Sequence, residues 1–187
     1  MALKAAGIEE IDKVLALHYR YQIDSIAEAD KKDGFVTTAF TAQQLRSLIE
    51  REQGLFIALK DDEVVAYVMA ASWPFWSAWP MFAYMIGGLE KLEYKGQALS
   101  TENSYQYGPV CVDKRVRGSG VLEKLFEFSR ARMAPRYPVL VTFINKSNPR
   151  SYAAHTRKLG LEVIAEFDYN GSRYYELAYD TAKALPL

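Results

Sequence analysis

One stretch near the middle of the chain constrains the fold more than any other, because it joins an apolar strand, a glycine loop and a helix start. The run Val110-Cys111-Val112 is typical of a buried strand, and residues 115–120 then read Arg-Val-Arg-Gly-Ser-Gly. An amphipathic helix is predicted from residue 121 to about residue 132. The first N–H groups of a helix lack internal partners and carry partial positive charge. We therefore predict an anion site at this loop.

The loop has the features of a phosphate site, although the two commonest phosphate motifs are absent. Gly118 and Gly120 would let a phosphate approach the backbone, while Arg115 and Arg117 add cations. No Lys-Ser/Thr pair follows Gly120, which excludes a P-loop, and Glu123 breaks the dinucleotide-binding pattern. A glycine-bearing turn without a ligand is the alternative interpretation.

A second informative stretch covers residues 138–161. The β-branched run 139–144 is suited to a buried strand. Asn148 or Ser147 can cap the next helix, with Pro149 at the first helical position. The helix is expected to run to about residue 159 and to end at Gly160.

These two stretches together resemble the core of the GNAT superfamily of acyl-CoA-dependent N-acetyltransferases. The pattern Arg-x-x-Gly-x-Gly over residues 115–120 resembles the Gln/Arg-x-x-Gly-x-Gly/Ala motif of that family. The ending Lys158-Leu159-Gly160-Leu161 is similar to the family's Lys-Leu-Gly-Phe. The resemblance covers residues 105–180 well, and the region before it agrees in pattern only.

The resemblance implies an α/β (α+β) fold of the GNAT type. Its central sheet is mixed and mostly antiparallel, it splays apart between two strands, and helices cover both faces. With 187 residues and 50% hydrophobic composition, the chain fits a single domain over residues 1–187. An aromatic-rich insertion at about residues 73–103 replaces a short turn of simpler family members.

The resemblance also implies acetyl-CoA as cofactor, with its pyrophosphate on the backbone amides of the loop and its pantetheine arm beside the preceding strand. Pro109, which cannot donate a hydrogen bond, is consistent with a bulge or gap in that strand. The cofactor-binding residues implied in this way are Val110, Cys111, Val112, Arg115, Arg117, Gly118, Ser119, Gly120, Val121, Asn148, Ser151 and His155.

The general acid is less clearly indicated. The family often uses a tyrosine about four residues before the glycine that ends the second helix, and Thr156 stands at that position. Counting seven residues from Asn148 gives His155 instead, because one extra residue lies between His155 and Gly160. We expect His155 to contact the sulfur or the substrate, with Tyr152 as the reserve acid. A histidine on the helix surface is the alternative.

A base is needed because an amine is almost wholly protonated at neutral pH. Glu102, just before the strand that leads to the loop, is the candidate base or substrate carboxylate. Asp113, just after that strand, is more simply interpreted as supporting the turn and neutralising Arg115. His18 is interpreted as a structural residue.

The remaining elements follow from periodicity and turn residues. We expect helices over residues 8–30 and 41–51, and a strand hairpin over 55–59 and 64–72. A helix is expected within the insertion, at about 81–92. The last hairpin, 162–169 and 173–179, turns at Asn170-Gly171.

Composition limits the partners. The formal net charge is zero and no basic run is present, so we expect no nucleic-acid partner. No run of about 20 uncharged apolar residues occurs, and the first residues lack the apolar core of a signal peptide, so we expect a cytoplasmic protein with no membrane partner. The single cysteine, Cys111, is expected to be a small buried apolar residue. The motifs indicate no metal site.

The function implied by the resemblance is transfer of an acetyl group from acetyl-CoA to a primary amine of a small molecule or a peptide. One alternative is an acyl-CoA-binding module with weak or no catalysis, since the usual tyrosine is missing. Another is a partner-binding protein that uses the aromatic insertion. The insertion itself suits a lid, a small satellite core or a homodimer contact.

Overall fold

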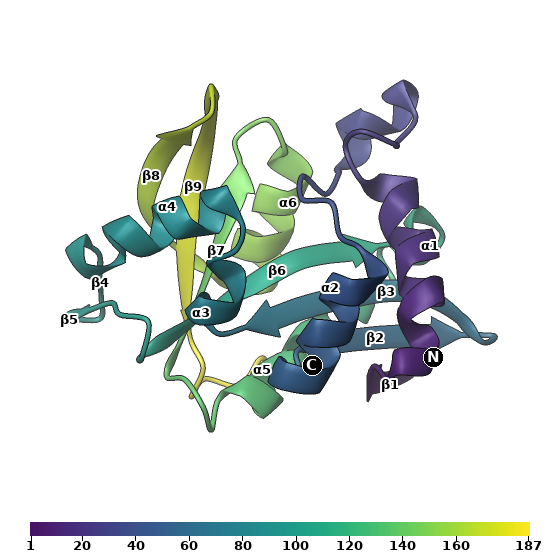
Figure 1. The fold of residues 1–187 in the computed structure, drawn as a ribbon, viewed down its shortest axis with the longest axis horizontal. Coiled ribbons are helices and arrows are strands. Elements are labelled where there is room, and N and C mark those ends of the chain that lie inside the picture. Colours follow the sequence, from purple (N-terminus) through teal and green to yellow (C-terminus); the bar gives the residue numbers. More distant parts are fainter. The chain divides into compact units, whose positions relative to one another are not determined.

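The computed structural model describes all residues from 1 to 187 as two compact units, each built from several stretches of chain. The first unit comprises Met1–Ala70, Gly108–Arg130 and Leu185–Leu187, and the second comprises Ala71–Tyr107 and Ala131–Ala184. One seven-stranded sheet has the strand order β1-β2-β3-β6-β7-β9-β8 (Figure 1). All its described ladders are antiparallel except that of β6 with β7, which confirms the predicted mixed, mostly antiparallel sheet.

The first unit contains the N-terminal part of the sheet. Strand β1 pairs with β2, and β2 pairs with β3 across the turn at Asp61 and Asp62. The N–H of Asp113 at the end of β6 donates to the carbonyl of Val65 on β3 at 2.9 Å. These strands span Ala2–Ala5 (β1), Leu55–Lys60 (β2), Glu63–Ala71 (β3) and Ser104–Val112 (β6).

Short helices of the first unit bury apolar side chains that recur at three- and four-residue spacings. Leu17, Leu45 and Leu48 are each at most 1% exposed. The helices are η1 (Ile8–Glu10), α1 (Ile11–Tyr21), η2 (Glu28–Asp33), α2 (Ala42–Ser47), η3 (Leu48–Glu52), η5 (Lys114–Val116) and α5 (Val121–Met133).

The predicted helix over residues 8–30 is wrong in its second half, because α1 ends at Tyr21. Gln22 adopts an extended backbone and forms a bridge with Val36. Its buried side chain donates to the carbonyl of Thr37 and accepts from the N–H of Asp24. The apolar spacing continues past this point, but these hydrogen bonds satisfy the backbone in a loop instead. Strand β1 was not predicted.

The second unit contains the C-terminal part of the sheet. The parallel ladder of β6 with β7 covers only Ser104 to Gln106, paired with Val139 to Val141. Strand β7 then continues to Asn145 with β9 on its other side. Strands β7 (Val139–Asn145), β9 (Ser172–Asp180) and β8 (Glu162–Tyr169) are antiparallel neighbours, and the predicted Asn170-Gly171 turn joins the last two.

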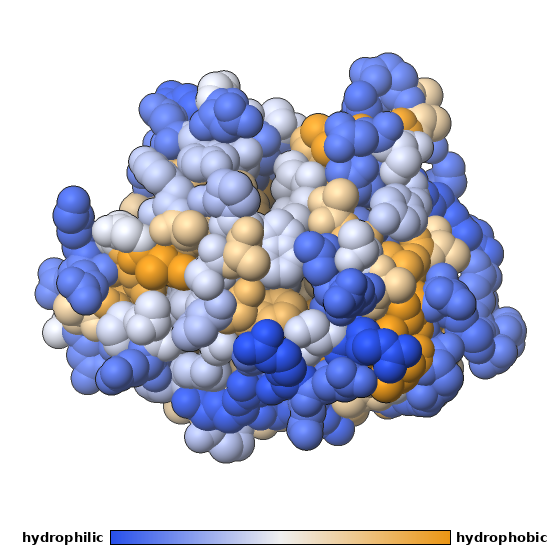
Figure 2. All heavy atoms as spheres, viewed as in Figure 1, coloured by the Kyte–Doolittle hydropathy of each residue, from blue (hydrophilic) through white to orange (hydrophobic).

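The insertion packs on one face of this part of the sheet. Trp73 and Trp76 are fully buried, and Phe82 of α4 contacts Phe143 of β7 with ring centroids 5.6 Å apart. The surface over α4 remains partly apolar (Figure 2). The insertion is thus a satellite core, built from α3 (Trp73–Trp76), α4 (Pro80–Gly88), η4 (Leu89–Lys91), β4 (Glu93–Tyr94) and β5 (Gln97–Ala98).

The opposite face of the same strands carries helix α6 (Pro149–Ala153) and its continuation η6 (Ala154–Lys158). Tyr152 packs on Tyr175 with ring centroids 4.6 Å apart, and His155 packs on Tyr107 at 6.1 Å. The predicted helices on both faces are therefore present in this unit. None of the helices in the chain combines the length and apolar character needed to cross a membrane.

Candidate functional site

The glycine loop lies in the first unit, between the end of β6 and the start of α5. Gly118 and Gly120 have φ angles of 81° and 79°, in the left-handed region where a Cβ is strained. A Cβ placed on either glycine would meet no atom within 4 Å. The surface beside both glycines is therefore open, and only glycine gives the backbone this path without strain.

Backbone donors gather at this open surface. The N–H groups of Gly118, Gly120, Val121 and Leu122 donate no hydrogen bond in the structure. The 13-residue helix α5 begins at Val121 and directs the positive end of its dipole toward them. Unpaired N–H groups, a helix start and two glycines form a suitable cradle for a pyrophosphate group.

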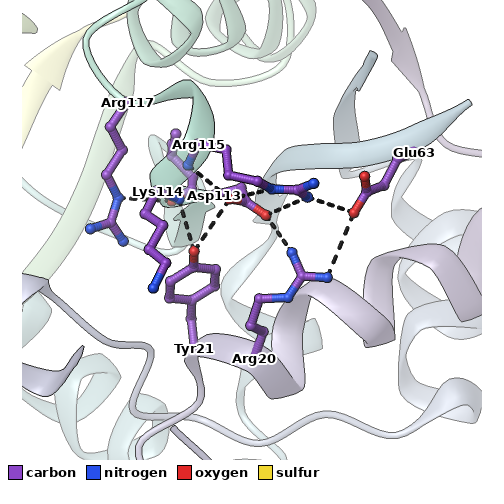
Figure 3. A network of polar contacts seen from close by, with 8 residues as sticks. Arg20, Tyr21, Glu63, Asp113, Lys114, Arg115 and Arg117 are labelled. Atoms are coloured by element: carbon purple, nitrogen blue, oxygen red, sulfur yellow. Dashed lines mark hydrogen bonds and ion pairs between the residues drawn. The ribbon is translucent and has the colours of Figure 1, made fainter. Parts of the chain in front are cut away.

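A buried carboxylate fixes the start of the loop (Figure 3). Asp113 is 1% exposed and accepts hydrogen bonds from the N–H and guanidinium of Arg115 at 2.8–3.1 Å. The guanidinium of Arg20 also donates to it, and Arg115 reaches Glu63 at 2.6 Å. Burial alone would raise the pKa of Asp113, but Arg115 and Arg20 outweigh it and lower this pKa to about 2. The interpretation of Asp113 as a turn support that neutralises Arg115 is confirmed.

The side chain of Arg117 has a bracing role too. Its guanidinium donates to the carbonyls of Val112 at 3.0 Å and Asp33 at 2.9 Å, and it lies over the ring of Tyr21. The Tyr21 hydroxyl accepts from the N–H of Lys114 at 2.8 Å (Figure 3). Both loop arginines are thus bound to protein groups, and phosphate contacts by their guanidinium groups stay a prediction.

The network that holds the loop, which we call the brace, is formed by Arg20, Tyr21, Asp113, Arg115 and Arg117. The sequence revealed only part of it. Arg20 and Tyr21 lie about 90 residues before Asp113, and they carried only a helical pattern. No local spacing connects them with the loop. Cys111 is buried, and burial raises the pKa of its thiol, as expected for a small apolar residue rather than a reactive thiol.

In the second unit, helix α6 begins as predicted. The side chain of Asn148 accepts from the N–H of Ser151 at 3.2 Å, and Pro149 stands in the first turn. Ser151 is half-buried. The predicted cap and helix start are confirmed, while the predicted cofactor contacts of Asn148 and Ser151 remain predictions.

The extra residue in this helix has a structural explanation. Residues 154–158 form a π-helical turn, in which the N–H of Leu159 donates to the carbonyl of Ala154 five residues earlier. A π-turn accommodates one added residue in a helix and is frequent at functional sites. It allows His155 to keep its distance from Asn148 while Gly160 still ends the helix, with a φ of 75°.

The imidazole of His155 has a defined proton position. It is 7% exposed, and its Nδ1 lies 2.8 Å from the carbonyl oxygen of Ser151. A carbonyl only accepts, so Nδ1 carries the hydrogen and Nε2 has the free electron pair in the neutral ring. Burial lowers the pKa of His155, which favours the neutral form at pH 7. The ring is therefore arranged to accept a hydrogen bond through Nε2.

The other two predicted catalytic residues lie in different elements of the chain. Tyr152 is half-buried against Tyr175, on the same sheet face as His155. Glu102 is exposed in the turn before β6, where its N–H donates to the hydroxyl of Ser100 at 3.3 Å. The role of Glu102 as a base stays a prediction.

Comparison by sequence finds no relative: no family model matches the chain, and no curated protein matches it. Solved structures do match over nearly the whole chain. The smu.2055 protein from Streptococcus mutans UA159 superposes with a TM-score of 0.65 at 16% identity, covering 97% of this chain and 99% of that one. An N-acetyltransferase from Staphylococcus aureus Mu50 gives 0.62 at 17% identity, with coverages of 96% and 98%.

A third neighbour was solved with its cofactor. The putative acetyltransferase yncA from Salmonella typhimurium, described with acetyl-CoA, has a TM-score of 0.65 at 13% identity, covering 96% of this chain and 93% of that one. Most of these neighbours are GNAT-type N-acetyltransferases. The sheet order and the glycine loop before α5 agree with that likeness. The chain therefore has the fold of the GNAT N-acetyltransferases.

Proposed function

We propose that this protein transfers an acetyl group from acetyl-CoA to the primary amine of a small molecule or a peptide. The glycine loop carries the proposal, because its open surface and unpaired N–H groups fit the pyrophosphate of the cofactor. The brace around Asp113 holds those donors in place before any ligand arrives. Donors that are already ordered lose little conformational entropy on binding. When bound, acetyl-CoA supplies the activated acetyl thioester.

The gap between strands β6 and β7 supports the same proposal. The ladder between β6 and β7 stops after Gln106, so backbone groups of β7 beyond Val141 have no partner from β6. Such groups can pair with an extended amide-bearing chain, which is the chemistry of pantetheine. Val110, Cys111 and Val112 remain proposed contacts of this arm.

The structure suggests a specific role for His155. With hydrogen on Nδ1, its Nε2 accepts a hydrogen bond, as from a thiol S–H or an ordered water. Its lowered pKa makes it a weak base, so the ammonium proton of the acceptor needs a stronger one. Tyr152 remains the proposed reserve acid for the departing thiolate.

One alternative, partner binding through the aromatic insertion, is less well supported. Trp73, Trp76 and Phe82 are buried within the second unit and are not available to a partner. Of the aromatic side chains in the insertion, Tyr84 is 52% exposed and itself packs on Phe167 and Tyr169. The other alternative is a module that binds acyl-CoA without catalysis. The experiment below separates it from an enzyme by measuring binding and acetyl transfer independently.

The test is calorimetric titration of acetyl-CoA into the wild type and into Gly120→Glu, followed by thiol-release assays with a panel of primary amines. Glutamate at position 120 would place a carboxylate on the anion cradle, and we expect binding at least 100-fold weaker. Gly171→Glu is the matched control, because Gly171 has a φ of 78° and equally open surroundings in the β8–β9 turn.

Acetyl-CoA should bind Gly171→Glu as tightly as it binds the wild type. Equal weakening in both variants would trace the effect to backbone strain and would contradict the assignment of the loop. Tight binding without acetyl transfer to any amine would favour the non-catalytic binding module.

A further inference from the structure

The second unit buries a carboxyl group that no protein group neutralises. Glu176 on β9 is 5% exposed, and its Oε1 is buried without a hydrogen-bond partner. Its carboxyl group makes no hydrogen bond or ion pair in the structure. The other two buried acidic residues differ, since Glu10 pairs with Lys4 and Asp113 is held by two arginines. A buried carboxylate without a donor is costly and therefore needs an explanation.

The strand register places Glu176 on the face that the insertion covers. Glu176 lies directly opposite Phe143 on β7 and Ala165 on β8, and directly opposed residues share a face. The ring of Phe143 contacts Phe82 of α4 at 5.6 Å and Tyr174 at 5.7 Å. Glu176 thus lies beside aromatic side chains on the covered face. Of the acids on this face it is the one without a partner, since Glu162 accepts from Tyr94 and Asp180 pairs with Lys95.

The side-chain oxygen of Gln106 likewise has no hydrogen-bond donor beside it. Gln106 is fully buried on β6, opposite Val141, and its Oε1 has no hydrogen-bond partner. Its neighbour on the same strand face, Ser104, accepts from the indole N–H of Trp73 at 3.0 Å, which places this face toward α3. Two unpaired acceptors therefore belong to one sheet face, and both are able to accept hydrogen bonds from a ligand.

Solvent reaches this face beside Glu176. Phe143 and Ala165, its two cross-strand partners, are both partly exposed although they lie within the sheet. The insertion therefore leaves the surface on either side of Glu176 incompletely covered.

We propose that this face binds the acceptor, with the carboxylate of Glu176 holding the substrate's ammonium group and removing a proton from it. The substrate class is a cationic primary amine with an apolar or aromatic body. An ammonium group supplies three donors, and aromatic rings attract cations through their faces. This inference rests on the proposed acetyl transfer and adds the acceptor and the base to it.

The proton balance of the step is simple. The ammonium gives one proton to Glu176, so that the neutral nitrogen can form its bond to the thioester carbon as the carbon–sulfur bond breaks. The nitrogen then loses a second proton, the thiolate takes one, and one proton leaves to solvent. Burial raises the pKa of Glu176 to about 7, which suits a base that works near neutral pH.

The test compares Glu176→Gln with the wild type and with Glu90→Gln, an exposed acid in the same unit. The probes are 2-phenylethylamine and its uncharged analogue 2-phenylethanol. Calorimetry and tryptophan fluorescence measure how tightly each protein binds them. We expect the wild type and Glu90→Gln to bind the amine at least tenfold more tightly than the alcohol. Glu176→Gln should lose this preference while binding acetyl-CoA unchanged.

Equal binding of the amine by Glu176→Gln, or no binding of the amine by the wild type, would overturn the assignment. Glutamine has nearly the same shape and removes an unpaired buried charge, so the variant should fold, as circular dichroism can verify. Acetyl-CoA titration separates the two proposals, because a wrong assignment of Glu176 leaves cofactor binding intact. If the wild type itself did not bind acetyl-CoA, the proposed acetyl transfer would be contradicted.

Discussion

At the scale of single residues, the glycine loop depends on one carboxylate. Asp113 joins the loop's own Arg115 to Arg20 of α1 and, through Arg115, to Glu63 of β3. The lowered pKa of Asp113 means that this charge stabilises the fold at any pH above about 3.8 and that the stabilisation is lost as the pH falls toward 2.

Asp113→Asn should therefore destabilise the protein by about 2 kcal/mol at pH 7, because two arginines lose a buried partner. It should also weaken acetyl-CoA binding by misplacing the loop. Urea unfolding and calorimetry measure the two effects. Asp62→Asn is the control, since Asp62 pairs with Lys13 at the surface with 87% of its side chain exposed. The free energy of unfolding of Asp62→Asn should differ from that of the wild type by less than about 1 kcal/mol. Similar losses in both variants would contradict the bracing role.

The residues of the candidate site differ in how far the sequence could reveal them. Asn148 and Pro149 were predictable because a helix cap is a local pattern. Arg20 was not, because its partner Asp113 is remote in sequence. Glu176 carries no local signal either, since a glutamate in a strand normally faces water. Only the register with β7 and β8 shows that it is buried.

At the scale of elements, the insertion behaves as a core rather than as a lid. Trp76 is fully buried, stacks on Phe82 at 4.8 Å between ring centroids, and donates its indole N–H to the carbonyl of Gln106 at 3.3 Å. The β4–β5 hairpin is fixed at the far end by Tyr94, which donates to Glu162 at 2.8 Å, and by Lys95, which pairs with Asp180.

Trp76→Ala should cost about 3 to 5 kcal/mol of stability, because it leaves a cavity in the second unit. Tyr84→Ala, which truncates an aromatic ring that is 52% exposed, should cost about 1 kcal/mol or less. Thermal and urea unfolding provide the comparison. A small cost at Trp76 would mean that the insertion is a mobile lid.

Local patterns identified the elements that are defined by local chemistry. The strand, loop and helix around Gly118, the hairpin at Asn170-Gly171 and the helix within the insertion were all predictable. The helix over residues 8–30 was overextended, because apolar spacing continues beyond Tyr21, where the buried Gln22 diverts the chain. Strand β1 has only four residues and forms because β2 offers an edge.

At the scale of the whole molecule, the most deeply buried acid of each unit responds to pH, and the two responses are opposite. Asp113 in the first unit has a lowered pKa, and Glu176 in the second has a raised one, about 7 against an ordinary 4.5. Below pH 4.5 Glu176 is protonated both folded and unfolded. As the pH rises to 7, the unfolded chain releases the proton first, and stability is lost.

Glu176→Gln should therefore gain about 3 kcal/mol over the wild type at pH 8 and almost nothing at pH 4. Urea unfolding of both proteins at pH 4, 6 and 8 without ligand measures this difference. A gain that is the same at every pH would show that Glu176 has the same pKa in the folded and the unfolded protein, and it would contradict the raised pKa. Glu90→Gln again serves as the reference, with no expected change.

The division of β6 between the two units has a consequence for synthesis on the ribosome. Strand β3 is complete at Ala71, but its neighbour β6 is complete only at Val112. At roughly 5 to 20 residues per second, this interval of about 40 residues lasts on the order of 2 to 8 s. During that time the apolar β3 has an open edge, and such edges pair readily with other chains. Nascent chains of this protein are therefore expected to depend on chaperones until residue 112 has emerged.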